Sequence, residues 1–108
     1  MIHQLSEAHS LVQIWINELR DVAIQQDRMR FRRNIERIGE VAAYEISKTF
    51  SYQPIAINTP LATTTSYTLQ QQPVVATILR AGIPLFQGLM NYLDKADSSF
   101  VAAYRKHV

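Results

Sequence analysis

The chain has 108 residues, of which 47% are hydrophobic and 19% charged, so its composition is that of one small folded domain and excludes a disordered chain. The formal net charge of +2 is too small to indicate nucleic acid by itself, and the absence of cysteine excludes disulfides and thiolate chemistry. Because neither a signal peptide nor about 18 consecutive apolar residues can be found, we expect a cytoplasmic protein with no membrane contact.

The first half of the sequence predicts two helices. Ser10 is a suitable N-cap for a helix that runs to about Ile24, and Asp27 is a second N-cap candidate for a helix from Arg28 to Lys48. In the first helix the expected apolar stripe is Leu11, Ile14, Trp15, Leu19 and Val22. In the second helix it is Phe31, Ile35, Ile38 and Ala42.

From Ser51 the pattern changes to that of strands. Residues 51–69 alternate and are rich in Thr, Ile and Tyr, with a turn around residues 58–60, which predicts a β-hairpin arm. The continuous apolar run from Val74 to Leu79 is typical of a strand buried on both faces.

The last third of the chain predicts the order strand, helix, strand. Pro84 suits the first turn of a helix that runs to about Leu93, and Phe100 to Tyr104 reads as another short buried strand. These elements make one βαβ unit with parallel strands, which needs further strands to form a stable sheet.

We therefore predict an α/β fold with three regions in a single domain. Residues 1–50 are helical, residues 51–72 form the β-arm, and residues 73–108 begin a parallel-sheet core. Since the chain stops just after a strand-like run, we expect it to be the N-terminal part of a protein about twice as long.

The turn after the first core strand is the main candidate site. Ligands of α/β folds bind beyond the carboxyl ends of the strands, where Arg80, Ala81 and Gly82 are expected. Gly82 permits an unusual backbone turn, small Ala81 admits a ligand to the main chain, and N–H groups before a helix bind anions. Arg80 adds a planar cation for phosphate oxygens. The alternative is an arginine paired with a carboxylate of the protein, beside a glycine that only makes a turn.

A second candidate lies at the end of the next strand, in the run from Tyr104 to His107. Both strands of a parallel pair end at the same edge, so Arg105 is expected on one rim with Arg80, where both could meet one polyanion. The alternative is a solvated basic loop.

The arginines between Arg28 and Arg37 favour a solvated helix face over an RNA surface. We expect Arg30, Arg33 and Arg37 opposite the apolar stripe, with local pairs Arg32–Glu36 and Arg37–Glu40. The histidines His3, His9 and His107 lack the spacing of a metal site.

In both halves the chain resembles the uracil phosphoribosyltransferase family. The shared features of the second half are the run ILRAG at residues 78–82, Gly88, and Tyr104-Arg105. In the first half they are Arg30-Phe31-Arg32, Ile38-Gly39 and Tyr44-Glu45.

This resemblance implies the fold of a type I phosphoribosyltransferase, whose parallel sheet follows N-terminal helices and a β-arm. It implies a glycosyltransferase that converts uracil and 5-phosphoribosyl 1-diphosphate to UMP and diphosphate in pyrimidine salvage. Arg80, Ala81, Gly82 and Arg105 would bind the phosphoribosyl diphosphate. Mg²⁺ would be carried by that substrate, and some family members respond to GTP.

The resemblance also implies a homo-oligomer. The first helix with Trp15 is a candidate interface, although core burial explains it equally well. The family's 5′-phosphate loop and base pocket find no match in this sequence, so we expect the chain alone to be inactive. One alternative is a non-catalytic regulatory or oligomerisation module derived from the same family; another is an RNA-binding helical module.

Overall fold

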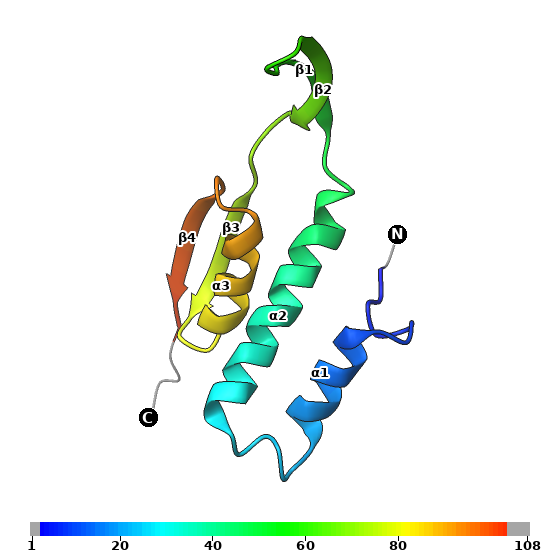
Figure 1. Cartoon of the computed structure of the whole chain (residues 1–108). Coiled ribbons are helices and arrows are strands. Elements are labelled where there is room, and N and C mark those ends of the chain that lie inside the picture. Colours follow the sequence, from blue (N-terminus) through cyan, green and yellow to red (C-terminus); the bar gives the residue numbers. More distant parts are fainter. Residues whose placement is uncertain (1–2, 104–108) are drawn as a thin grey trace.

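The computed structural model describes residues 3–103 and places three helices and four strands among them (Figure 1). The helices are α1 (Leu11–Arg20), α2 (Arg28–Ser47) and α3 (Ile83–Tyr92). The strands are β1 (Tyr52–Asn58), β2 (Thr63–Leu69), β3 (Val74–Leu79) and β4 (Asp97–Ala102). The predicted α/β class and the order of the elements are confirmed.

Both predicted N-caps are present. The Ser10 hydroxyl accepts the N–H of Val12 at 3.2 Å, and the Asp27 carboxylate accepts the N–H of Arg30 at 3.1 Å. The predicted end of α1 at Ile24 is wrong, because the helix ends at Arg20. Asp21 is extended there, and its carboxylate accepts the N–H of Ala23 at 2.9 Å, a local turn that competes with the helix.

The apolar stripe of α1 also differs from the prediction. Val12 is the buried residue, whereas Leu11, Ile14 and Val22 are exposed. Val12 lies about 100° around the helix from Leu11, so the face that meets α2 is displaced from the predicted one. Trp15 is half-buried.

The stripe predicted for α2 is only half-covered, and Phe31 is exposed. The buried residues of this helix are Asn34, Gly39 and Ala43. Asn34 faces α1 and Gly39 faces α3, roughly 140° apart around the helix. The apolar stripe lies between these two directions, which explains its incomplete burial.

Helices α2 and α3 cross in backbone contact at two glycines. A Cβ added to Gly39 would lie 2.6 Å from the carbonyl oxygen of Leu85 and 3.2 Å from the α-carbon of Gly88. A Cβ added to Gly88 would collide with the carbonyl oxygen of Glu36 and lie 3.0 Å from the Glu40 nitrogen. Since real Cβ atoms do not pack this closely, only glycine at both positions permits the crossing.

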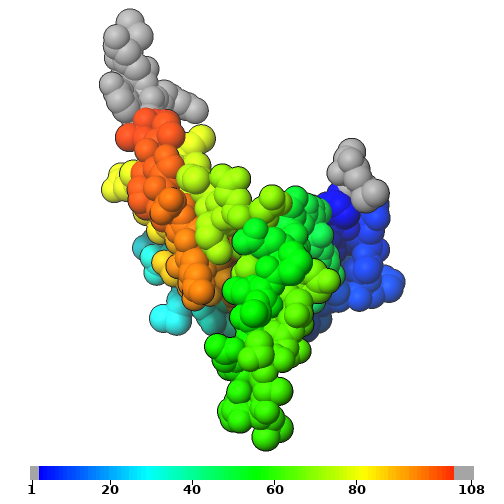
Figure 2. Space-filling view, turned by 90° about the horizontal axis from the view of Figure 1, so that it is seen from above, coloured from blue at the N-terminus to red at the C-terminus, as the bar shows by residue number. Residues whose placement is uncertain are grey.

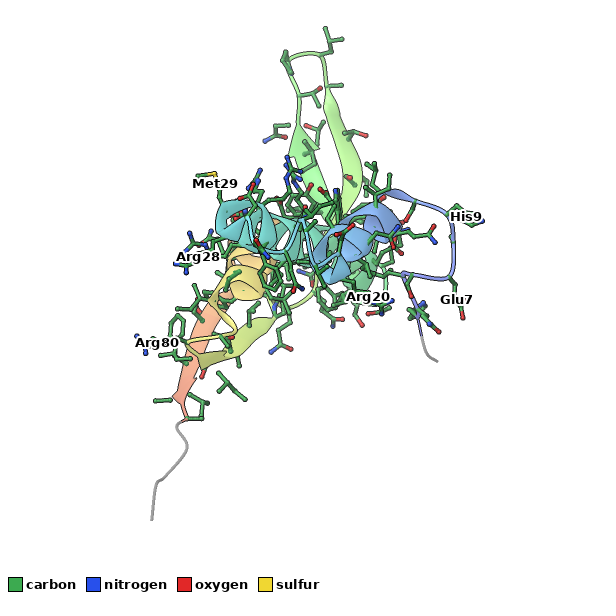
Figure 3. All side chains as sticks on the ribbon, turned by 90° about the horizontal axis from the view of Figure 1, so that it is seen from below. Glu7, His9, Arg20, Arg28, Met29 and Arg80 are labelled. Atoms are coloured by element: carbon green, nitrogen blue, oxygen red, sulfur yellow. The ribbon has the colours of Figure 1, made fainter. Side chains whose placement is uncertain are left out.

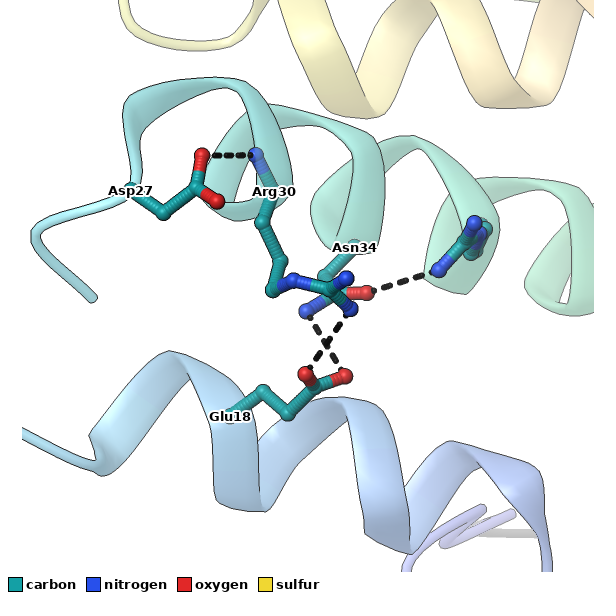
Figure 4. A network of polar contacts seen from close by, with 5 residues as sticks. Glu18, Asp27, Arg30 and Asn34 are labelled. Carbon is teal, nitrogen blue, oxygen red and sulfur yellow. Dashed lines mark hydrogen bonds and ion pairs between the residues drawn. The ribbon is translucent and has the colours of Figure 1, made fainter. Parts of the chain in front are cut away.

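A polar network joins α1 to α2 (Figure 4). Glu18 of α1 pairs with Arg30 at 3.0 Å and accepts the Asn34 side-chain amide at 3.4 Å. The Asn34 carbonyl in turn accepts the Arg37 guanidinium at 3.2 Å, so this fully buried side chain uses both of its polar ends. Hydrogen bonding of this kind offsets the cost of burying a polar group.

The predicted pairs Arg32–Glu36 and Arg37–Glu40 are wrong. Glu36 instead accepts Arg33 at 2.8 Å and the Asn91 amide of α3 at 2.9 Å. The tertiary neighbour draws the Glu36 carboxylate toward α3, which helical spacing alone does not reveal.

The hairpin arm projects from the body of the molecule. β1 and β2 pair antiparallel with Asn58 opposite Thr63, so the predicted turn around residues 58–60 is confirmed. In Figure 2 the arm (green) extends beyond the rest of the chain, between β4 (orange) on one side and the N-terminal helix (blue) on the other. Nearly all its residues are exposed, and Leu61 at the tip is 97% exposed.

β3 and β4 pair in parallel, which confirms the βαβ unit. β4 begins at Asp97 and not at Phe100, and the predicted end at Tyr104 lies outside the described residues. The prediction that both strands are buried is wrong: Val75 faces inward, whereas Val74, Ile78 and Val101 are exposed. α3 covers one face of the pair, and Phe86 contacts Phe100 there with ring centroids 5.1 Å apart.

The overall shape is extended, with a radius of gyration of 17.9 Å. A compact domain of about 100 residues has a radius near 13 Å. The arm and the open sheet face account for the difference. Among the described residues, no helix is both long and apolar enough to cross a membrane.

We predict that Gly88→Ala destabilises the complete protein by about 1–3 kcal/mol, because the added methyl group forces α2 and α3 apart. Without the crossing, alanine would stabilise the helix by up to about 1 kcal/mol, so the sign of the change is diagnostic. Urea unfolding measures it. Gln87→Ala, at an exposed position of α3, is the matched control and should stay within about 0.5 kcal/mol of wild type. A more stable Gly88→Ala protein would contradict the crossing.

Asn34→Ala should cost about 1–3 kcal/mol of stability, because it leaves part of the Glu18 and Arg37 hydrogen bonding unmet. The additional change Glu18→Ala should cost less in this variant than in the wild type. Thermal or urea unfolding of the four proteins gives the coupling energy. Purely additive effects would show that Asn34 and Glu18 do not interact.

Candidate functional site

The carboxyl ends of β3 and β4 lie side by side, since Leu79 pairs with Ala102. Arg80 follows β3 directly, and Figure 3 shows its side chain pointing away from the body at this end of the sheet. The peptide bond between Leu79 and Arg80 is cis. Arg105 lies outside the described residues, so its place on the same rim stays a prediction.

Gly82 is needed here for a reason that the sequence did not indicate. Its φ of −77° and ψ of −7° are open to any residue, so the predicted backbone requirement is wrong. A Cβ on Gly82 would instead collide with the Thr77 hydroxyl and lie 2.9 Å from the Ile78 carbonyl oxygen. The turn therefore folds back onto β3 so tightly that a side chain does not fit.

The N–H groups of the turn divide into two kinds. Gly82 donates to the Ile78 carbonyl and Ile83 donates to the Arg80 carbonyl, both at 3.2 Å. Within residues 3–103, the N–H groups of Arg80 and Ala81 have no backbone acceptor. The donors available to an anion are therefore those of the turn itself, and not those of Gly82 and Ile83 at the start of α3.

The Arg80 guanidinium is also open. Ion pairs within the described part of the chain join Glu18 to Arg30, Glu36 to Arg33, and Glu45 to Lys48, and none involves Arg80. The alternative of a carboxylate partner for Arg80 thus finds no support among these residues. A ligand role for Arg80, Ala81 and Gly82 stays a prediction that this geometry favours.

An open hollow of about 830 Å³ lies at this edge of the sheet. That volume is within the range of small-molecule sites, about 300–1,000 Å³. Its lining consists of Ala76, Thr77, Ile78, Leu79, Arg80, Ala81, Gly82, Val101 and Ala103. The lining combines one cation and two open N–H groups with small and apolar side chains, an arrangement that can hold a phosphate group.

Metal ligands are not part of this arrangement. In the portion of the chain that the structure covers, no three His, Asp or Glu side chains gather closely enough to hold a metal ion. Thr77 also lines the hollow, and the sequence did not identify it as a site residue. A threonine inside an apolar strand has no neighbouring pattern that indicates a function.

Three arginines of α2 have polar partners within the described part of the chain. Arg30 is tied to α1 through Glu18, Arg33 is tied to Glu36, and Arg37 donates to buried Asn34. These contacts give the arginines structural partners within the protein and favour the solvated helix face over an RNA surface.

Comparison with known proteins agrees with the resemblance seen in the sequence. Residues 6–108 match the family model described as uracil phosphoribosyltransferase. A uracil phosphoribosyltransferase of Porphyromonas gingivalis is 51% identical over 99% of this chain and 49% of its own length. One from Methanococcus vannielii is 36% identical over 78% of this chain and 37% of its own length.

A solved structure supports the fold. The structure of a protein from Aquifex aeolicus superposes with a TM-score of 0.76 and 24% identity, covering 93% of this chain and 47% of that one. The chain spans about half the length of the Porphyromonas relative. Because the family model covers nearly the whole sequence, the chain belongs to the uracil phosphoribosyltransferase family.

Proposed function

We propose that the complete protein containing this chain transfers the phosphoribosyl group of 5-phosphoribosyl 1-diphosphate to uracil in pyrimidine salvage. The bond from ribose C1 to the diphosphate oxygen breaks, a bond from C1 to uracil N1 forms, and the N1 proton leaves. The products are UMP and diphosphate. The observation that carries the proposal is the open turn after β3 in a member of this family, where Arg80 has no ion-pair partner among residues 3–103.

The chemistry of the turn suits the leaving group. Negative charge grows on the diphosphate as the C1–O bond breaks, while the ribose becomes cationic. A guanidinium and two backbone N–H groups aimed at the leaving group stabilise such charge. The Arg80 guanidinium and the N–H groups of Arg80 and Ala81 would thus hold the diphosphate, with Gly82 keeping the turn close to β3 and Arg105 of the following segment as a further contact. No side-chain nucleophile is required.

We further propose that Mg²⁺ reaches the site bound to the diphosphate. The hollow supplies an arginine and backbone N–H groups, which fit the anion and not the cation. The metal supplies charge neutralisation of the leaving group when bound. A response to GTP stays a prediction for the complete protein.

Self-association in the cytoplasm is a separate proposal. Leu11 and Ile14 of α1 are 63% and 53% exposed, and the arm adds Tyr67 at 69%. Leu11 and Ile14 are three residues apart and so lie on one face of α1, and contiguous exposed apolar surface is typical of interaction sites.

Arg80→Ala in the complete protein should weaken binding of phosphoribosyl diphosphate by roughly 30-fold and lower turnover at least as much. A charge-assisted contact to phosphate contributes about 2 kcal/mol, and more where it tightens in the transition state. Steady-state kinetics of UMP formation and calorimetric binding measure both effects.

Arg33→Ala is the matched control. Among the described residues Arg33 pairs with Glu36 alone, at the surface, so this substitution should leave the kinetics near wild type. Equal losses from both variants would make Arg80 structural. A complete protein that binds diphosphate but never forms UMP would favour the regulatory module.

Light scattering of the complete protein should give a mass of at least two protomers. Leu11→Asp together with Ile14→Asp should lower that mass if α1 forms the contact, because charge at a buried apolar interface is costly. Arg20→Asp on the exposed end of α1 is the control. A monomeric wild type would contradict the proposal of self-association.

A further inference from the structure

We propose that Thr77 is a positioning residue for the anion-binding turn, acting through Gly82. The inference rests on the proposed function and adds a residue that neither the sequence analysis nor the family resemblance assigned. Thr77 lies on β3, three residues before Arg80, and lines the same hollow. Its side chain is half-buried, on the same side of the strand as inward-facing Val75.

Thr77 occupies the space that a side chain at residue 82 would need. A Cβ on Gly82 would fall onto the Thr77 hydroxyl oxygen and lie 3.5 Å from the Thr77 Cβ. The α-carbon of Gly82 therefore rests directly against this hydroxyl group. The Gly82 N–H also donates to the Ile78 carbonyl at 3.2 Å, a second contact that holds the turn against β3.

The Thr77 hydroxyl has no hydrogen-bond partner among residues 3–103, so hydrogen bonding within this region does not explain why threonine stands here. What the hydroxyl offers is a small contact surface under a backbone atom. A methyl group at the same place is larger than the hydroxyl group. The hydroxyl group is also polar, so threonine and valine are not interchangeable in packed sites.

The position of Gly82 governs the donors of the site. Ala81 is bonded to Gly82, and Arg80 precedes Ala81, so a shift of Gly82 away from β3 also moves the N–H groups of these two residues. Electrostatic stabilisation needs donors held within about 0.5 Å of the productive geometry. The size of the residue 77 side chain next to Gly82 thus sets how well the turn fits a diphosphate.

Two substitutions separate shape from other effects. Thr77→Val in the complete protein places a methyl group against Gly82, and Thr77→Ser keeps the hydroxyl. We expect Thr77→Val to raise the KM for phosphoribosyl diphosphate and the Kd for inorganic diphosphate roughly tenfold. The KM for uracil should stay near wild type, and Thr77→Ser should bind both anions like the wild type. Thr64→Val, on the exposed arm, is the matched control.

Each outcome bears on the inference. Unchanged anion binding in Thr77→Val overturns it, and so does an equal loss for uracil and the diphosphate donor, which would indicate general damage. Circular dichroism and the Tm of each variant identify unfolding. If the wild type binds inorganic diphosphate but forms no UMP, the proposed function fails while the comparison of Kd values still decides the role of Thr77. Without any binding by the wild type, both fail.

Discussion

The contact of Gly39 with Gly88 is the constraint on which the described structure depends. It brings the backbones of α2 and α3 together without intervening side chains, and α3 in turn packs on β3 and reaches β4 through the contact of Phe86 with Phe100. The described apolar core is small, with Val12, Ala43, Val75 and Ala96 as its buried members. Close backbone packing therefore contributes what large buried side chains provide in bigger domains, since each atom in contact adds to dispersion attraction.

The helix crossing also positions the candidate site. α3 begins at the turn that carries Arg80, and its place against α2 is fixed by the two glycines and by the Glu36–Asn91 hydrogen bond. The turn itself is held against β3 by a hydrogen bond and by the Gly82–Thr77 contact. Rigid support behind an open cation and open N–H groups is what stabilisation of a leaving anion requires.

Polar contacts on α2 serve two neighbours at once. Glu18, Arg30 and Asn34 connect this helix to α1, whereas Glu36 connects it to α3. The arginines of α2 either take part in such contacts or are exposed to solvent. The sheet face that carries Val74, Ile78 and Val101 is exposed. This chain spans about half the length of its Porphyromonas relative.

Local patterns in the sequence were sufficient for the elements. Ser10 and Asp27 cap helices by contacts within three residues, Pro84 suits a first helical turn, and the hairpin follows from alternation around a short turn. The family also followed from the sequence, because the run from Ile78 to Gly82 stands in the expected order with the other motifs.

Tertiary structure decided which faces are buried, which ions pair, and why Gly82 is glycine. These depend on neighbours distant in the chain: α1 and α3 approach α2 from different sides, Asn91 shares the Glu36 carboxylate with Arg33, and Thr77 occupies the space of a side chain at residue 82. The sequence alone determined the local conformations, because hydrogen bonds and steric limits within a few residues control them. Packing was decided only in three dimensions, because it depends on shape and distance between segments that the sequence order does not specify.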